Sequence, residues 1–185
     1  TSSSLGGSIN SLRAMVNSLG TKKNITLAIF TQTDTSAQLI AEGYKVIYIN
    51  DWYYSTGARY RKIIVRIIVK CLSIVNSNLI YYFEILLHYS SLKKLASICY
   101  VRQINIIHAN NKISRDIFML WLKKLNLPII SHNRSHGFSN FGQLKRHKAN
   151  KHIFRFIAVS RSIKYDMINN GIDKKKISVL WNIPL

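Results

Sequence analysis

Cysteine is scarce in this sequence, with two residues among 185. Cys71 and Cys99 are well separated and lie within apolar, helix-like segments, so the sequence offers neither a disulfide framework nor a CxxC metal site. Reduced thiols are typical of a cytoplasmic protein. We therefore expect both cysteines to be unpaired.

Acidic residues are also few: seven Asp and Glu stand against 27 Lys and Arg, which gives a formal net charge of +20. Carboxylate catalysis has few candidates, and the sequence shows no paired carboxylates, no Ser/His/Asp set and no zinc motif. Self-repulsion at this charge destabilises a compact chain unless an anionic partner or salt offsets it. Nucleic acid, anionic lipid headgroups and phosphorylated ligands are the candidate partners.

Long hydrophobic runs are missing as well. The uncharged run in the most apolar region, Cys71 to Phe83, has 13 residues, whereas a membrane-spanning helix needs about 20. The first residues, Thr1 to Gly7, are small and polar and lack the features of a signal peptide. Because the sequence starts without Met, we expect the first residues of the natural protein to be missing.

The hydrophobic fraction of 48% is enough for a folded core, and 185 residues suit one domain better than two. Short apolar runs alternate with longer amphipathic ones. This pattern predicts a single α/β domain over residues 1–185, with an open, mostly parallel sheet and helices on both faces. The expected strands are Ile25 to Phe30, Lys45 to Ile49, Ile104 to His108, Pro128 to His132, Phe156 to Ser160 and Ile177 to Trp181.

Helices are expected between these strands because apolar residues recur there at helical spacing. The long segment from about Arg59 to Tyr100 predicts one or two helices, interrupted near Asn76-Ser77-Asn78, whose residue types favour caps and turns. The other expected helices are Ile9 to Leu19 before Gly20, Asp34 to Gly43, Ile113 to Leu125, and Ser160 to Gly171.

Two glycines, Gly6 and Gly7, come directly before the first expected helix. Glycine allows the backbone to approach a ligand closely, and the free amides at a helix start attract a phosphate or carboxylate. The spacing matches neither GxGxxG nor a Walker loop, so a binding loop and a tight turn both remain open.

Polar residues end two of the apolar strands, where ligands bind in open parallel sheets. The first set is His108, Asn110 and Asn111, and the second is His132, Arg134 and His136. Imidazole and guanidinium groups recognise phosphate or sugar hydroxyls, and a histidine can act as a base. The alternative is that His108 or His132 only donates a hydrogen bond to nearby backbone. No thiolate or carboxylate stands beside His132 and His136 to complete a metal site.

A basic amphipathic segment follows the aromatic residues Trp52 and Tyr53. Aromatic rings at headgroup level and cations on lipid phosphates are the pattern that binds an anionic membrane. The alternative is a solvated basic face on an ordinary packed helix. The basic residues expected on one helix face are Arg59, Lys62, Arg66 and Lys70, and a second cluster comprises Lys145, Arg146, Lys148, Lys151 and Arg155.

Five motifs together resemble the N-terminal domain of family 4 glycosyltransferases with the two-domain GT-B architecture. They occur in family order across nearly the whole chain, and the branch that builds bacterial surface glycans is the most similar. The motifs are Gly6-Gly7-Ser8, Ile106-Ile107-His108-Ala109-Asn110, Leu127 to Arg134, Phe156 to Ser160, and Lys176 to Asn182.

The resemblance implies a Rossmann-like domain that mainly holds the acceptor, while a C-terminal domain and a strand before Thr1 are expected to be missing. Gly6 and Gly7 would line the cleft, and Asn110 stands where many members have a second histidine. His132 and Arg134 match the family's His and Arg, although Ser135 replaces an acidic residue that often follows. Asn182 matches the asparagine of the interdomain linker.

The implied activity is transfer of a sugar from a nucleotide-sugar donor to a lipid-linked or growing surface glycan, without a metal ion or other cofactor. The implied location is cytoplasmic, at the inner face of the cell membrane. Since the donor domain is expected to be missing, we expect this chain alone to be inactive.

The main alternative function is a basic nucleic-acid-binding α/β module, which the net charge and the aromatic residues would also suit. However, the sequence contains no RNP, zinc-finger or helix-turn-helix pattern, so we expect no nucleic-acid partner. A sugar-nucleotide epimerase of the same architecture is a second alternative.

Overall fold

The computed structural model of the chain describes residues 13–14, 16–17, 25–29, 34–49, 59–110, 125–136, 138 and 142–181. The chain divides into two compact units, one formed by residues 1–58 with 182–185 and the other by residues 59–181. The single-domain organisation over residues 1–185 stays a prediction.

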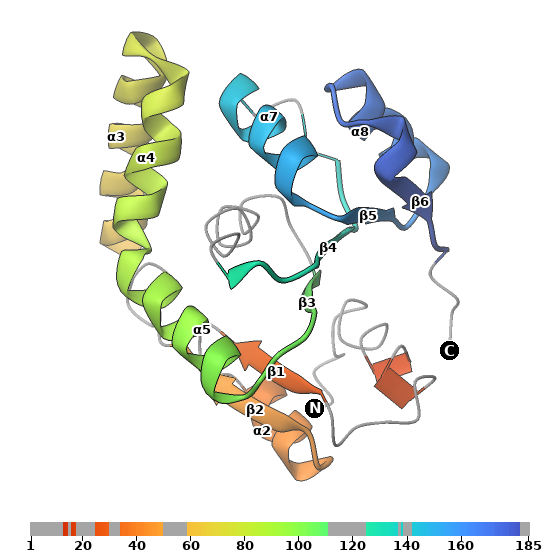
Figure 1. Ribbon diagram of the computed structural model, residues 1–185. Helices are drawn as coiled ribbons and strands as arrows, with labels where there is room; N and C mark the ends of the chain where they lie inside the picture. The colour runs from red at the N-terminus through yellow and green to blue at the C-terminus, as the bar shows by residue number, and fades with distance from the viewer. Residues whose placement is uncertain are drawn as a thin grey trace, which may run out of the picture. The chain divides into compact units, whose positions relative to one another are not determined.

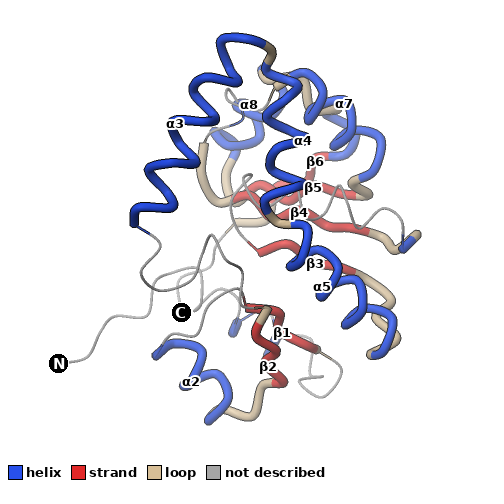
Figure 2. The backbone as a smooth tube through the Cα atoms, turned by 90° about the vertical axis from the view of Figure 1, so that its left-hand side faces the viewer, coloured by secondary structure: helices blue, strands red, loops and turns tan. Residues whose placement is uncertain are grey.

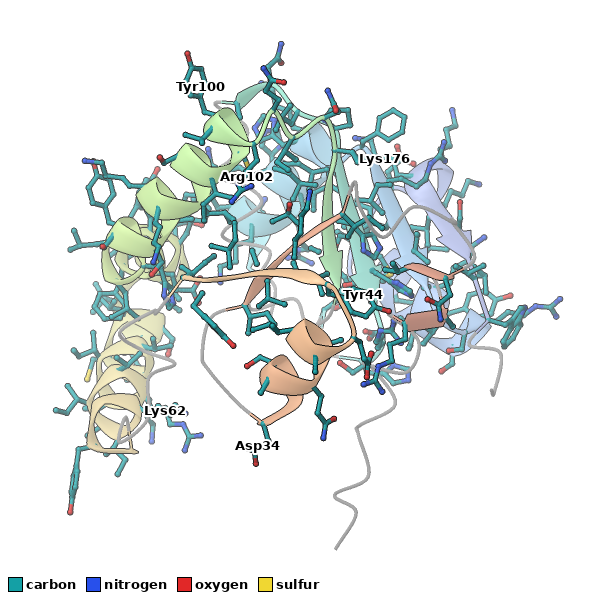
Figure 3. The ribbon with its side chains drawn as sticks, turned by 90° about the horizontal axis from the view of Figure 1, so that it is seen from below. Asp34, Tyr44, Lys62, Tyr100, Arg102 and Lys176 are labelled. Atoms are coloured by element: carbon teal, nitrogen blue, oxygen red, sulfur yellow. The ribbon has the colours of Figure 1, made fainter. Side chains whose placement is uncertain are left out.

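The first unit contains two parallel strands joined by a helix. Strand β1 (Thr26–Ile29) pairs with β2 (Lys45–Tyr48), and α2 (Asp34–Ala41) provides the crossover that a parallel pair requires. Figure 3 shows Asp34 at the start of α2 and Tyr44 shortly after its end. The core of this unit consists of Val16, Leu39 and Tyr44, with Ile25, Leu27, Ile29 and Val46 packed against them.

Three helices open the second unit: α3 (Arg59–Val75), α4 (Ser77–Leu87) and α5 (Tyr89–Val101). The side chain of Asn76 accepts a hydrogen bond from the Asn78 amide at 2.9 Å and caps α4, which confirms the predicted interruption. A second break at the buried His88 makes three helices where one or two were expected. No glycine or proline marks that break in the sequence.

A four-stranded parallel sheet completes the second unit, in the order β3-β4-β5-β6. Figures 1 and 2 show α7 and α8 over the same face of this sheet. The predicted α/β class, with parallel strands flanked by helices, is therefore confirmed. The elements are β3 (Ile107–Asn110), β4 (Ile129–Asn133), α7 (Gln143–His152), β5 (Arg155–Ala158), α8 (Arg161–Asn169), the 3-10 helix η5 (Lys174–Lys176) and β6 (Ile177–Val179).

Helix α8 ends in a left-handed turn. The Gly171 amide bonds to the Ile168 carbonyl, the Ile172 amide bonds to the Met167 carbonyl, and Gly171 has φ +82°. This pair of bonds satisfies carbonyls at the end of a helix, and glycine adopts the positive φ without strain. The predicted stop at Gly171 is confirmed, and Gly43 ends α2 with the same two bonds.

The end of α5 corrects one predicted strand. Gln103, with φ 49°, takes the position that glycine has in the other two turns, and the Ile104 amide bonds to the Cys99 carbonyl at 2.9 Å. Ile104 is therefore part of the helix end. The strand expected at Ile104 to His108 instead runs from Ile107 to Asn110.

Replacing Ser160 by Ala is expected to destabilise the fold by about 1 kcal/mol, because Ser160 caps α8. Its hydroxyl accepts a hydrogen bond from the Ile163 amide at 3.2 Å. Ser97→Ala is the matched control, since it removes an exposed hydroxyl within α5 and is expected to cost less than about 0.5 kcal/mol. Urea denaturation measures both, and equal losses would show that Ser160 is not a stabilising cap.

Candidate functional site

The adjacent strands β3 and β4 bring two histidines together. His108 pairs with Ile130 across the two strands, and Asn110 pairs with His132. Side chains alternate along a strand, so His108 and His132 are diagonal neighbours on one face of the sheet. Their ring centroids are 5.5 Å apart, and the ring planes meet at 60°.

Three ring nitrogens of the His108–His132 pair are buried without a hydrogen-bond partner in the described part of the chain. His132 is 5% exposed, and both of its ring nitrogens are shielded from solvent. Nε2 of His108 is likewise buried without a partner among the described residues. A buried polar group without a hydrogen bond costs roughly 1–3 kcal/mol, so three such nitrogens favour binding of a polar ligand.

Both histidines are held in their neutral form at pH 7. Burial, the Arg134 guanidinium and the His108 ring lower the pKa of His132 from 6.5 to about 4. Burial and Arg134 also lower the pKa of His108. At pH 7 each ring therefore offers one N–H donor and one acceptor nitrogen.

A neutral imidazole pair suits hydroxyl groups, because a hydroxyl also both donates and accepts hydrogen bonds. With a pKa of about 4, His132 is a weak base at pH 7 and does not carry the positive charge that would attract a phosphate. Arg134, which directly follows β4, is the nearby cation, and burial lowers its pKa. The pair is therefore best suited to hold and orient an uncharged polar ligand.

Asn133 follows His132 in β4 and is a buried polar residue on the opposite face of the sheet, which the sequence motifs did not single out. Its side chain is 1% exposed, and its Nδ2 donates to the carbonyl of Ser131 at 3.0 Å. The Oδ1 atom is buried without a partner among the described residues. The signal available in the sequence was the unbroken polar run at the carboxyl end of β4, where an apolar strand meets the ligand-binding edge.

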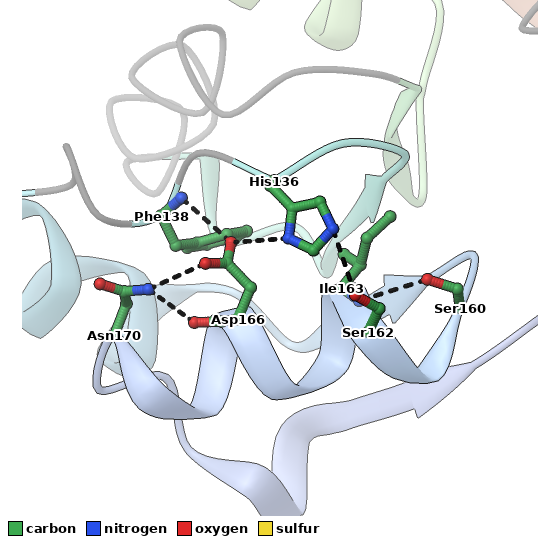
Figure 4. Close-up of polar contacts among 7 residues, drawn as sticks. All are labelled: His136, Phe138, Ser160, Ser162, Ile163, Asp166 and Asn170. Atoms are coloured by element: carbon green, nitrogen blue, oxygen red, sulfur yellow. Dashed lines mark hydrogen bonds and ion pairs between the residues drawn. The ribbon is translucent and has the colours of Figure 1, made fainter.

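A second polar cluster connects the segment after β4 to α8 (Figure 4). Nε2 of His136 lies 3.2 Å from Oγ of Ser162, and Nδ1 lies 3.9 Å from a carboxylate oxygen of Asp166. The sequence shows no Ser/His/Asp set, because these three residues are brought together only by the fold. That same Asp166 oxygen accepts a hydrogen bond from the Phe138 amide at 3.4 Å.

This arrangement does not have the geometry of a catalytic triad. A 3.9 Å separation is too long for the hydrogen bond that orients the histidine in such enzymes. The other oxygen of Asp166 accepts from Nδ2 of Asn170 at 3.1 Å. The cluster therefore links the segment after β4 to α8, and we assign it no catalytic role.

The remaining expected site residues are placed as follows. Asn110 ends β3 and pairs with His132 of β4. Helix α3 begins at Arg59 and contains Lys62, Arg66 and Lys70. Gly6, Gly7, Asn111, Asn182, Trp52 and Tyr53 lie outside the described residues. Within the described ranges, no group of three or more His, Cys, Asp or Glu side chains could hold a metal ion.

The family model of Glycosyltransferase Family 4 matches residues 30–183, which include the His108–His132 pair and Arg134. The chain belongs to this family. The resemblance seen in the five motifs is thereby confirmed at the level of the family.

Solved structures of the Anabaena protein HepE are similar to this family 4 chain. The complex of HepE with UDP and glucose matches with a TM-score of 0.65 and 12% sequence identity. The complexes with UDP-glucose and with UDP match with TM-scores of 0.64 and 0.62, also at 12% identity. Each match covers 98% of this chain and 42% of the HepE chain.

These matches show that the family 4 chain has the Rossmann-like α/β fold of a GT-B glycosyltransferase. The chain spans about 42% of the length of the solved structures it matches. No curated protein sequence matches it significantly.

Proposed function

We propose that this chain is the acceptor-side domain of a glycosyltransferase that moves a sugar from a nucleotide-sugar to a lipid-linked or growing surface glycan. Family 4 membership supports sugar transfer. HepE binds UDP and UDP-glucose, and on that basis we propose a nucleotide-sugar donor for the complete enzyme.

The observation that carries the acceptor role is the pair of buried, neutral imidazoles on β3 and β4. Glycan acceptors present hydroxyl groups, and the three unpartnered ring nitrogens of His108 and His132 match hydroxyls in both donor and acceptor capacity. In this role His132 and His108 hold an acceptor hydroxyl in position, and Arg134 adds a positive charge beside the ligand.

The complete enzyme requires a second domain that holds the donor. The chain covers 42% of HepE, so we propose that the rest of the natural protein supplies the donor-binding half. The 185-residue chain alone is expected to transfer no sugar, because one half of a two-domain cleft cannot position donor and acceptor together.

In the enzyme encoded by the natural reading frame, His132→Phe is expected to reduce kcat/KM for sugar transfer roughly tenfold to a hundredfold, through the loss of one or two hydrogen bonds. The assay supplies radiolabelled UDP-glucose and membranes of the source organism, and measures label in the glycan and lipid fractions. His147→Gln is the matched control, because it changes an exposed histidine of α7.

Transfer that is unaffected by His132→Phe would contradict the acceptor site. Duplex DNA binding that weakens steeply with salt, together with no transfer from any nucleotide-sugar tested, would instead favour the nucleic-acid-binding alternative.

A further inference from the structure

Helix α4 carries a stripe of exposed apolar side chains. Leu79 is 41% exposed, Tyr82 is 58% exposed and Leu86 is 74% exposed. Their spacing of three and four residues places them on one side of the helix, in the pattern with which helices pack against each other. These three residues are here called the α4 stripe. Ile74 and Val75, just before α4, add to the exposed apolar surface at 80% and 76% exposure.

The opposite side of α4 contacts α7, as Figure 2 shows. Glu84 forms an ion pair with Lys145 of α7, and Nζ of Lys148 lies over the ring of the buried Tyr81, 5.4 Å from its centroid. At 100° per residue, Tyr81 and Glu84 face away from the α4 stripe. The stripe is therefore the outer side of a helix whose inner side already packs against the second unit.

Tyr82, in the middle of the α4 stripe, is held by its neighbour. The rings of Tyr81 and Tyr82 meet edge to face, with centroids 5.3 Å apart and planes at 82°. Such an aromatic contact is favourable, and Tyr81 is itself fixed by burial. Tyrosines are enriched among the residues that contribute most to protein interfaces. Tyr82 therefore has the properties of an anchor residue before any partner binds.

We propose that the α4 stripe binds the same stripe of a second copy of this chain, with the two α4 helices antiparallel about a two-fold axis near Tyr82. In this arrangement Tyr82 packs on its own counterpart, and Leu79 packs on Leu86 of the other copy. A two-fold contact requires a surface that complements itself, and a stripe of leucine and tyrosine does so. This inference concerns a surface outside the candidate site and is independent of the proposed function.

The distribution of charge favours a second copy over other occupants. Because the chain has a net charge of +20, two copies associate best where the surfaces that meet carry no cations. The one charged residue of α4 is Glu84, which is paired with Lys145 on the side that contacts α7. Without cations, the α4 stripe lacks the charge attraction that an anionic lipid surface or a nucleic acid would use.

The α4 stripe does not belong to a membrane-spanning helix. Helix α4 has 11 residues, whereas a spanning helix needs about 20. Within the described parts of the chain, no helix combines the length and the apolarity needed to span a membrane.

The exposed apolar area approaches what a stable dimer needs. Together with Ile74 and Val75, the α4 stripe presents roughly 650 Å² per copy, against about 800 Å² per partner in a standard interface. Asn76 and Asn78 are exposed, uncharged polar residues at the start of α4 and supply part of a polar rim. An interface of this size supports a micromolar or tighter dissociation constant.

The test is sedimentation equilibrium of the purified chain, with salt dependence as the first readout. We expect a dimer whose dissociation constant falls at least roughly threefold between about 0.15 M and about 0.5 M NaCl, because salt screens the repulsion between the two copies. Charge-driven binding to nucleic acid or anionic lipid instead weakens as salt is added.

Substitutions at Tyr82 test the two-fold geometry. Tyr82→Lys and Tyr82→Glu each place like charges together at the axis and are expected to weaken self-association at least roughly thirtyfold. An equal mixture of the two variants places opposite charges there and is expected to associate at least roughly tenfold more tightly than either alone. Lysine and glutamate are good helix formers, so α4 is expected to remain folded.

Tyr165→Lys is the matched control for these variants. It makes the same change on a tyrosine of α8 that is 60% exposed, and it is expected to change the dissociation constant less than about threefold. Leu79→Gln with Leu86→Gln tests the apolar contact without changing charge and is expected to weaken the dimer at least roughly tenfold.

The proposal fails if the wild-type chain is monomeric at about 100 μM in both salt concentrations. It also fails if Tyr165→Lys weakens the dimer as much as Tyr82→Lys, or if the mixture of charged variants associates no better than either alone. A monomeric wild-type chain that binds phosphatidylglycerol vesicles, and loses this binding with the glutamine pair, would assign the α4 stripe to a bilayer instead.

Discussion

Lowering the pH from 7 to 4 is expected to reduce the free energy of unfolding by about 3 kcal/mol through His132 alone. The pKa of His132 is about 4 in the folded chain, below its ordinary value of 6.5, because of burial, Arg134 and His108. Between these two values the unfolded chain binds a proton that the folded chain does not. Stability is therefore retained above pH 6.5 and lost as the pH falls toward 4. His108 acts in the same direction.

The measurement is urea denaturation at pH 7 and pH 4. His132→Phe keeps a planar ring at this position but cannot be protonated, so the acid loss is expected to shrink by about 3 kcal/mol relative to wild type. His147→Gln removes an exposed histidine of α7 and is expected to leave the acid loss in place, because His132 is intact. An acid loss of the same size in His132→Phe and wild type would show that His132 is not held neutral.

Phe156→Ala is expected to destabilise the fold by about 3–5 kcal/mol, the range for deleting a large side chain from a close-packed core. Phe156 is fully buried in β5, where it pairs with Ser131 of β4 and Ile177 of β6. The neighbouring strands are hydrogen-bonded to β5 on both sides, so the structure can collapse only partly into the cavity.

Phe154→Ala is the matched control for this prediction. Phe154 precedes β5 by one residue and is 62% exposed, with the Arg155 guanidinium 5.9 Å from its ring centroid. Its removal is expected to cost less than about 1 kcal/mol. Similar losses for both variants, measured by thermal unfolding, would contradict the placement of Phe156 in the core.

The strands were predictable because each contains a short apolar run between segments with a helical pattern. All six expected strands form, with ends that differ by one or a few residues. The helix boundaries at Gly43, Gly171 and Asn76 could be predicted from residue type. Glycine adopts the positive φ of a helix-ending turn, and an asparagine side chain accepts a hydrogen bond from a free amide at a helix start. The turn at Gln103 and the break at His88 could not be predicted from the sequence, because neither glutamine nor histidine favours those backbone conformations.

The sequence predicted less of the candidate site. It placed His108 and His132 near the ends of neighbouring strands, but their 5.5 Å separation and their burial depend on the register of β3 against β4. The contacts of His136 with Ser162 and Asp166 join residues 26 to 30 positions apart. Such contacts follow from tertiary packing and leave no periodic signal.

The outward isoleucines of α3 illustrate a different limit. Apolar residues at helical spacing predict core packing, and only the structure shows that Val65 is buried while Ile64 and Ile67 are exposed. The helix has apolar residues on both sides, so its sequence pattern does not reveal which side the sheet and the neighbouring helices cover.

The central claim is that this chain is the acceptor-side half of a two-domain glycosyltransferase, and sequencing the natural reading frame beyond Leu185 tests it most directly. The account predicts that the frame continues for roughly another domain, about 100–200 residues, with alternating strand and helix patterns and a donor motif containing glutamate. A stop codon directly after Leu185 would contradict the claim, because the chain would then have no donor-binding half.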